Sequence, residues 1–274
     1  MKTFLSVELK KTLAGNEIFS WINQLANNAS EKDIYRAKEG RKTFCFRVED
    51  RSFFVKLHSG IGWREIFKNL FKLRLPVLGA TSEYLAIEAL TAAGIATMSI
   101  KGFGETGLNP AKKCSFIITE ELYNTISLEN YCRDWQGYPR RYKYKRMLVE
   151  NLARVSRTMH SVGINHRDFY LCHFHLEVES LANGNPQCYL IDLHRAQLRS
   201  ITPKRWLIKD LAGLYYSAMD VGLSRQDLLI FIKVYSNMSA SKALKKNRKF
   251  WLAVAERARK LYIRDHQKEP PSIF

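Results

Sequence analysis

Gly-Ile-Asn-His-Arg-Asp-Phe-Tyr-Leu-Cys-His-Phe, residues 163–174, is the most informative segment of the 274-residue chain. It follows a run in which apolar residues recur at intervals of four, three, four and three. Such spacing predicts a helix with a buried stripe, and a glycine such as Gly163 is a common helix end. The segment is therefore predicted to be a loop that directly follows a buried helix. The apolar stripe consists of Leu148, Leu152, Val155, Met159 and Val162.

Three consecutive residues of this loop, His166, Arg167 and Asp168, match the His-Arg-Asp pattern of loops that catalyse phosphoryl transfer to a hydroxyl. In such loops the aspartate accepts the hydroxyl proton and orients the oxygen for in-line attack. Arg167 would lie beside it as a positive structural or substrate-facing group. Because three residues match easily by chance, the interpretation depends on companions elsewhere in the chain.

The first companion is the apolar run Tyr-Leu-Ile-Asp-Leu, residues 189–193, which places Asp192 24 residues after Asp168. A kinase-like fold needs a carboxylate there, because Mg²⁺ prefers oxygen ligands beside the phosphates. The alternative is a turn residue at a strand end. His173 stands where protein kinases have a metal-binding Asn, and a neutral imidazole is a poor Mg²⁺ ligand. We keep His173 as a candidate at the metal site, with phosphate binding and a structural role as alternatives.

The second companion is Lys56, inside the apolar run Phe-Phe-Val-Lys-Leu of residues 53–57. A lysine in such a strand requires a partner if it is buried. In a kinase-like fold it contacts the nucleotide phosphates and pairs with a glutamate on the next helix. Glu83 is the preferred partner because it lies near the start of the predicted helix 81–93, and Glu88 is the alternative. An edge-strand lysine that points to water is the other interpretation of Lys56.

Two further features concern the phosphates and the catalytic loop. The chain has no Gly-rich GxGxxG loop, so Arg41 and Lys42 beside Gly40 are candidates to hold phosphates through their side chains.

Asp210 opens a predicted helix downstream of Asp192. An aspartate in this place buttresses the catalytic loop of kinase folds, or else it is a first-turn acid favoured by the helix dipole.

The two halves of the chain differ in pattern. Residues 33–39, 41–49 and 51–58 have strand composition with turn residues between them, which predicts a three-stranded meander. The second half is mostly helical in pattern. Further predicted elements are helices at 62–75, 81–93 and 206–219, a helix capped by Ser224, strands at 97–103 and 114–121, and basic helices near the C-terminal end.

This order of elements predicts an α+β, bilobal, protein-kinase-like fold. Residues 1–30 are expected to be an N-terminal extension, residues 31–122 a small β-rich N-lobe, and residues 123–274 a larger, mostly α-helical C-lobe. At 46% hydrophobic residues the chain can form a proper core, which excludes wholesale disorder. We expect no transmembrane helix and no signal peptide, and the five scattered cysteines predict reduced thiols.

The formal net charge of +18 is concentrated in a few places. Residues 64–74, 133–146, 195–209 and 242–264 together carry 24 basic and 3 acidic side chains. Such stretches indicate an anionic partner, such as nucleic acid, a membrane surface or an acidic small molecule, or else ordinary solvated helix faces. The predicted helix 62–75 has a basic row opposite an aromatic side, so it could lie on a membrane interface or pack within the N-lobe. That aromatic side includes Trp63, Phe67 and Phe71.

Several motifs go beyond a generic kinase. With GINHRDFYLCHF, the runs IDLHRAQLR (191–199), KDLAGLYYSAMDVGL (209–223), LPVLGA (75–80) and SFIITEEL (115–122) closely resemble the lipopolysaccharide core heptose(I) kinases of Gram-negative bacteria. The resemblance covers roughly residues 30–240 and is strongest in the second half. His173 belongs to the family's own pattern. Phe169 and Leu171 stand where Cys and Ile are expected, which bears on acceptor fit.

The resemblance implies ATP-dependent phosphorylation of the first heptose of the inner core, on a Kdo-lipid A-linked acceptor. It implies ATP and Mg²⁺ as cofactors and a peripheral location on the cytoplasmic face of the inner membrane. Carried over by position, Asp168 is the base, Asp192 the metal ligand and Lys56 the phosphate-contacting lysine. An acyl carrier protein is a further implied partner, and its acidity suits a basic patch. Candidate contacts to the anionic acceptor are Arg167, Arg195, Arg199, Lys204 and Arg205, because guanidinium groups match phosphate and carboxylate geometry.

Two other classes of function stay open at this stage. One is an atypical bacterial protein kinase. The other is a non-catalytic, basic nucleic-acid-binding protein on a kinase-like scaffold, in which Tyr138, Tyr142 and Tyr144 stack on bases. That interpretation leaves Lys56 and the two aspartates without a role, so nucleic acid is not the expected partner.

Overall fold

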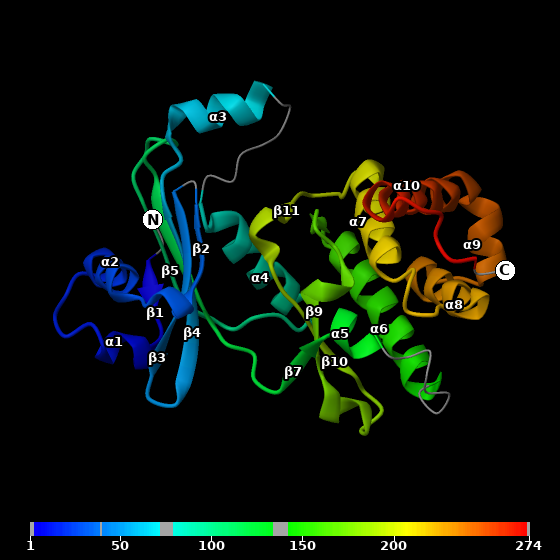
Figure 1. The fold of residues 1–274 in the computed structure, drawn as a ribbon, viewed down its shortest axis with the longest axis horizontal. Helices are drawn as coiled ribbons and strands as arrows, with labels where there is room; N and C mark the ends of the chain where they lie inside the picture. The colour runs from blue at the N-terminus through cyan, green and yellow to red at the C-terminus, as the bar shows by residue number, and fades with distance from the viewer. Residues whose placement is uncertain (1–2, 39, 72–78, 134–141, 273–274) are drawn as a thin grey trace. The chain divides into compact units, whose positions relative to one another are not determined.

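The computed structural model describes residues 3–38, 40–71, 79–133 and 142–272. The chain divides into two compact units, one formed by Met1–Ile87 with Met98–Tyr123 and the other by Glu88–Thr97 with Asn124–Phe274. The first unit holds the large sheet and the second holds most of the helices (Figure 1). This division agrees with the α+β class predicted from the sequence.

The first unit is built on a six-stranded antiparallel sheet with the order β1-β5-β6-β4-β3-β2. The predicted meander is confirmed, since β2, β3 and β4 pair in succession. The strand bounds are β1 Phe4–Leu5, β2 Ile34–Lys38, β3 Arg41–Val48, β4 Arg51–Ser59, β5 Ile100–Thr106 and β6 Cys114–Glu120.

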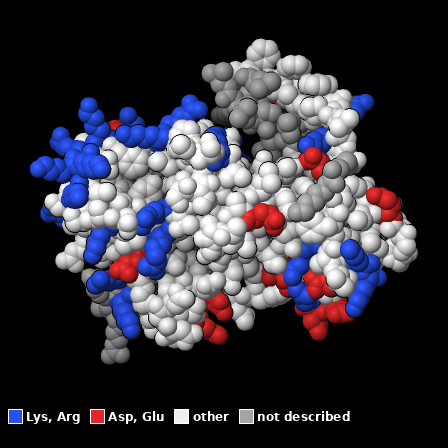
Figure 2. All heavy atoms as spheres, turned by 180° about the vertical axis from the view of Figure 1, so that it is seen from behind, with Lys and Arg blue, Asp and Glu red and all other residues white. Residues whose placement is uncertain are grey.

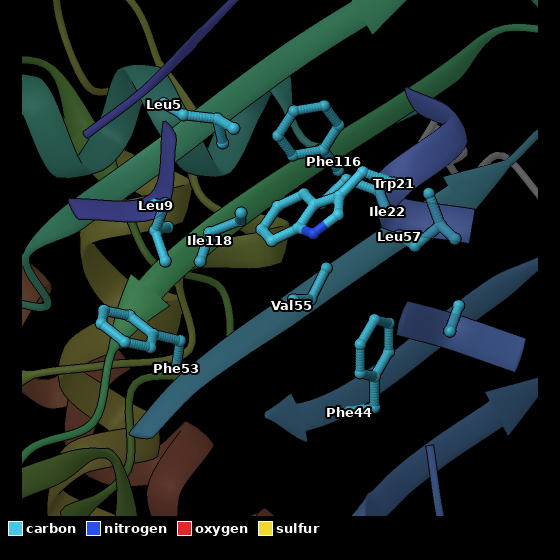
Figure 3. Close-up of a cluster of buried hydrophobic side chains, with 11 residues drawn as sticks. Leu5, Leu9, Trp21, Ile22, Phe44, Phe53, Val55, Leu57, Phe116 and Ile118 are labelled. Carbon is cyan, nitrogen blue, oxygen red and sulfur yellow. The ribbon is translucent and has the colours of Figure 1, made fainter. Parts of the chain in front are cut away.

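Alternation along β4 determines which side chains enter the core. Phe53, Val55 and Leu57 are buried on one face of the sheet, as the period of two requires, and Lys56 therefore points to the other face. The core face is covered by α1 (Val7–Lys11) and α2 (Ile18–Asn28), as Figure 3 shows. The buried side chains labelled there are Leu5, Leu9, Trp21, Ile22, Phe44, Phe53, Val55, Leu57, Phe116 and Ile118.

The segment expected as an N-terminal extension takes part in this core. Leu9, Trp21 and Ile22 are buried against the sheet, and β1 adds an edge strand to it. Complete burial of one such side chain contributes roughly 1.5–3 kcal/mol. Residues 4–28 therefore stabilise the first unit.

Helix α3 (Gly62–Phe71) begins where the sequence predicts, and the rest of the predicted helix, with Lys72, lies outside the described residues. Its aromatic side is largely exposed, at 50% for Trp63, 52% for Phe67 and 87% for Phe71. Ile66 is buried. The expectation that this apolar side packs within the N-lobe is therefore wrong for the three aromatic residues.

The second unit is mostly helical, and two small sheets cross it. The predicted stripe lies on α6 and is buried except at Val162, which falls beyond the end of that helix and is 36% exposed. Ser224 caps α8 through a capping box with Asp227, as the sequence predicts. The helices are α4 Thr81–Ala92, which spans both units, α5 Leu128–Cys132, α6 Tyr142–Ser161, α7 Lys204–Ser217, α8 Arg225–Ser236, α9 Ala240–Lys246 and α10 Arg248–His266.

The two small sheets position the loops that carry the chemistry. One consists of β7 (Thr125–Ser127), β9 (Phe174–Glu177) and β10 (Gln187–Leu190). The other pairs β8 (Ile164–Asn165) with β11 (Gln197–Leu198), so residues 166–168 leave one strand where Arg195 approaches the other.

Gly163 makes the turn from α6 into β8 possible. Its φ is +82°, and a Cβ atom there would lie 1.7 Å from the carbonyl oxygen of Arg199. The amide N–H of Arg199 donates to the carbonyl of Gly163 at 3.0 Å. No other residue type fits this close approach without moving β11 away from β8.

Lys and Arg side chains crowd the surface of the second unit where its C-terminal helices lie, whereas the first unit shows both signs of charge (Figure 2). None of the helices in the described parts of the chain combines the length and the apolar composition that a membrane crossing requires.

Candidate active site

Asp210, a buried residue of α7, holds the His-Arg-Asp loop. One carboxylate oxygen accepts the amide N–H of His166 at 2.7 Å, and the other accepts the amide N–H of Arg167 at 2.9 Å. Arg167 has a left-handed backbone with φ +76°, which costs on the order of 1–3 kcal/mol and persists only where surrounding contacts hold it. Because α7 begins at Lys204, Asp210 is not a first-turn acid. It buttresses the loop.

His166 connects this loop to the segment that carries Asp192. Its ring lies within the core, where Nε2 donates to the carbonyl of Ile191 at 2.9 Å. Burial lowers the pKa of His166 despite that hydrogen bond and the nearby charge of Asp210, so the imidazole is neutral. The ring also stacks on His173, with 5.6 Å between centroids.

Asp168 follows directly, with a side chain that is 19% exposed. One guanidinium nitrogen of Arg195 donates to both of its carboxylate oxygens, at 2.8 and 2.9 Å. Arg195 was expected to contact the acceptor, but the structure directs it onto Asp168. A carboxylate has about four lone-pair positions, so Asp168 keeps the capacity to accept a substrate hydroxyl proton.

Asp192 follows β10 in a left-handed conformation with φ +59°, which aspartate tolerates better than most residues. Its Oδ1 accepts a hydrogen bond from Nδ1 of His194 at 2.7 Å. Nε2 of His173 lies 3.6 Å from its Oδ2. Two histidine rings therefore orient a carboxylate that stays 31% exposed.

His173 also contacts the catalytic loop, since Nδ1 donates to the backbone carbonyl of Asp168 at 2.6 Å. Burial disfavours its charged form. Hydrogen bonds with Cys172 and with that carbonyl, together with the charge of Asp192, outweigh burial and raise the pKa of His173 to about 9. The hydrogen bond to the carbonyl of Asp168 gives His173 a structural contact in the catalytic loop, and its place at the metal site stays a prediction.

In the first unit, Nζ of Lys56 donates to Oε1 of Glu83 at 2.5 Å. Glu83 is 1% exposed, whereas Glu88 lies on the exposed side of α4. The pair is the one preferred from the sequence. Lys42 behaves differently from the expectation, because its Nζ donates to the carbonyl of Ala26 near the end of α2. This hydrogen bond ties Lys42 to α2, and the phosphate roles of Lys42 and Arg41 stay predictions.

Trp206 of α7 is the feature that sequence reasoning missed. Four cationic groups lie within 6 Å of its ring, and two of them, Arg205 and Lys209, come from the same helix. The i, i+3 spacing of Trp206 and Lys209 was a usable signal, but the approach of Arg167 and Arg199 depends on the tertiary fold. Lys204 is not part of this group, since its ammonium lies over Phe250.

Comparison with known proteins agrees with this geometry. A family model described as "Lipopolysaccharide kinase (Kdo/WaaP) family" matches residues 26–235. A lipopolysaccharide core heptose(I) kinase WaaP from Pseudomonas aeruginosa is 43% identical over 265 residues, covering 96% of this chain and 97% of the relative. One from Escherichia coli is 46% identical over 243 residues, covering 87% and 90%.

A solved structure described as WaaP in complex with acyl carrier protein superposes with a TM-score of 0.82 at 38% identity. It covers 96% of this chain and 100% of that one. The predicted kinase-like fold and the predicted class of enzyme, an ATP-dependent phosphotransferase, are confirmed. From the matched range and these identities, the chain belongs to the lipopolysaccharide kinase (Kdo/WaaP) family.

Proposed function

We propose that this chain transfers the γ-phosphoryl group of ATP to a hydroxyl of the first heptose of the lipopolysaccharide inner core, on a Kdo-lipid A-linked acceptor. The observation that carries the proposal is Asp168 on a loop fixed by Asp210, next to a group of cations suited to an anionic glycolipid. The relatives named above as heptose(I) kinases support the choice of sugar.

In this proposal Asp168 accepts the proton of the attacking hydroxyl, and Arg195 keeps its carboxylate in one orientation. Such general base catalysis contributes about 10²- to 10⁴-fold. Lys56, held by Glu83, contacts the phosphates of ATP. A cation that is fixed in advance stabilises developing charge without having to reorganise.

Asp192 is the residue that would hold Mg²⁺. The described residues contain no group of three or more His, Cys, Asp or Glu that could hold a metal ion. This fits Mg²⁺, which keeps several waters and is bound through one or two carboxylates plus substrate phosphates. Bound there, the ion would neutralise charge on the phosphate oxygens. The His194 hydrogen bond and the proximity of His173 orient the carboxylate for that task.

We also propose an acyl carrier protein as a partner. The similar solved structure is of a WaaP bound to one. In this chain, α9 and α10 present a basic face to an acidic protein. An apolar cavity of about 660 Å³ within the second unit is suited to an acyl chain, and it includes Lys245 and Arg248 among its lining residues. Its apolar lining includes Leu148, Leu152, Leu214, Phe231 and Trp251.

A peripheral position on the inner membrane is the last part of the proposal. The exposed aromatic side chains of α3 and its cations Arg64 and Lys68 give it the composition of a helix that lies in an anionic interface. The glycolipid acceptor lies in such a membrane.

The experiment that tests the function is mass spectrometry of core lipopolysaccharide from a strain that lacks the protein. Complementation with the wild type should restore one phosphate, and complementation with Asp168→Asn should not. In parallel, purified protein receives labelled ATP together with the lipid acceptor or with protein substrates. Label on protein alone would contradict the proposal in favour of an atypical protein kinase.

A further inference from the structure

The cations around Trp206 come from three segments of the second unit. Arg167 lies on the catalytic loop, Arg199 follows β11, and Arg205 and Lys209 belong to α7. Their charged groups lie 5.7, 5.7, 5.4 and 5.3 Å from the centre of the Trp206 ring, in that order. These distances are within the reach of a cation–π contact, so one indole gathers four positive charges.

This cluster has no carboxylate of its own. The two aspartates that act on it electrostatically are Asp168 and Asp210. Asp168 is occupied by Arg195, and Asp210 accepts two backbone N–H groups with His160 3.5 Å away. In the described part of the chain, no carboxylate lies within ion-pair distance of the four cations. The guanidinium of Arg199 donates, among the described residues, to two neutral side-chain oxygens, those of Asn165 and Gln197.

Like charges repel one another, and three of the four cations, Arg167, Arg199 and Lys209, are partly buried, whereas Arg205 is exposed. Burial, together with the charges of Arg167 and Arg195, lowers the pKa of Lys209 against the opposing effect of the two aspartates. Burial and the charge of Arg195 lower the pKa of Arg167 in the same way. The cations therefore repel one another here, and a bound anion would relieve that repulsion.

Two buried donors also lack acceptors at this place. Nε1 of Trp206 and Nε of Arg167 are shielded from solvent and have no hydrogen-bond partner among the described residues. A buried donor without a partner costs about 1–3 kcal/mol. An oxygen anion would balance the charge, and arginine forks match carboxylate and phosphate.

We propose that Arg167, Arg199, Arg205 and Lys209, arranged around Trp206, form a subsite for an oxyanion of the acceptor, a sugar carboxylate or a phosphate near the reacting hydroxyl. This rests on the function proposed above and deepens it. The subsite is assigned to the acceptor because Arg167 directly precedes Asp168, which is proposed to accept the proton of the acceptor hydroxyl. Asp192, which is proposed to hold Mg²⁺ beside ATP, is contacted by His173 and His194 and not by the four cations of the subsite. Arg195 then acts through Asp168 as a positioning residue, and Lys204 lies outside the subsite.

The test uses the full chain with Arg205→Gln, Lys209→Gln and the double variant. Neither side chain donates a hydrogen bond among the described residues, so these changes leave the loop contacts intact. The matched control is Arg154→Gln with Arg157→Gln, two exposed arginines of α6. Loss of one charged contact to an oxyanion should raise the KM for the acceptor about tenfold, with the KM for ATP and the control unchanged.

Two modified acceptors identify the anion. In one the sugar carboxylates are converted to neutral amides, and in the other the phosphate esters are removed. The modification that makes wild type and double variant equal marks the oxyanion that the subsite binds. If the variants differ from the wild type by the same factor on every acceptor, or if the KM for ATP rises instead, the subsite is refuted.

The same assays separate this inference from the proposed function. A wild-type protein that phosphorylates no lipopolysaccharide acceptor would refute the function itself. A wild type that is active, with a double variant that behaves like the control, would refute the subsite alone.

Discussion

Lys56 in the first unit and three cations of the Trp206 cluster in the second unit, Arg167, Arg199 and Lys209, are partly buried, but their neighbours stabilise them differently. Lys56 has a carboxylate of its own, Glu83, at 2.5 Å. Among the described residues, the cluster has an aromatic ring and neutral side-chain oxygens, and no carboxylate within ion-pair distance. The ion pair fixes the position of Lys56 before ATP binds, whereas the proposed subsite leaves its charges for an anion of the acceptor. The contrast is between a cation that the protein itself pairs and cations that a bound anion would pair.

The largest expected effect follows from breaking the pair. Lys56→Met should lower kcat by about 10²- to 10³-fold, the usual effect of losing one group that stabilises transition-state charge. Glu83→Gln should lower the free energy of unfolding by about 3 kcal/mol, because it removes the buried carboxylate that forms an ion pair with Lys56. Phosphate transfer assays and urea unfolding measure the two quantities.

A double change sharpens this prediction. Lys56→Met with Glu83→Leu should recover most of the stability but none of the activity, since two apolar side chains often replace a buried ion pair without loss. Glu31→Gln, on an exposed residue of the same unit, is the control. If Glu83→Gln unfolds like this control, the pair does not stabilise the unit and the comparison fails.

Asp210 is a buried charge of the second unit that is held by backbone N–H groups, and Asp210→Asn is expected to have the next largest effect. The amide has only one acceptor oxygen for the N–H groups of His166 and Arg167. A lost hydrogen bond to a charged group lowers the free energy of unfolding by about 1.5–3 kcal/mol. We expect kcat to fall because Asp168 loses its fixed position.

Hydrogen exchange separates this positioning effect from general destabilisation. The amides of His166 and Arg167 should exchange faster in Asp210→Asn, while those of β4 stay protected. Asp50→Asn in the exposed turn between β3 and β4 should change neither. Unaltered exchange at both loop amides would contradict the role given to Asp210.

Sequence reasoning succeeded for elements and residues that a short local pattern predicts. The meander, α4, α6 and the cap of α8 follow from local periodicity and turn residues. Lys56 stood out because a cation in an apolar strand demands a partner, and the helix start pointed to Glu83. The pattern from Gly163 to Asp168 indicated a loop after a buried helix, which the structure contains.

It failed where the contacts are long-range. Arg167, Arg199 and Lys209 meet only because β8 pairs with β11 and α7 lies against the catalytic loop. Lys42 and Arg195 were assigned by their charge and place, and their contacts with the carbonyl of Ala26 and the carboxylate of Asp168 could not be foreseen. β1 is two residues long, too short for any periodic signal, so its pairing with β5 could not be foreseen.

The smallest expected effect is the dependence on salt, and it bears most directly on the contrast between paired and unpaired charge. Added salt shortens the Debye length from about 10 Å at 0.1 M to about 3 Å at 1 M and screens exposed charges more than buried pairs. The KM for the acceptor should therefore rise several-fold with salt in the wild type. It should rise less steeply in Arg205→Gln with Lys209→Gln, which retains fewer cations to be screened.

The stability difference between Glu83→Gln and the wild type should change little over the same range, because that pair is buried. Equal salt slopes for the KM of wild type and double variant would mean that the acceptor's charge is recognised elsewhere, and the unpaired cations around Trp206 would then need another explanation.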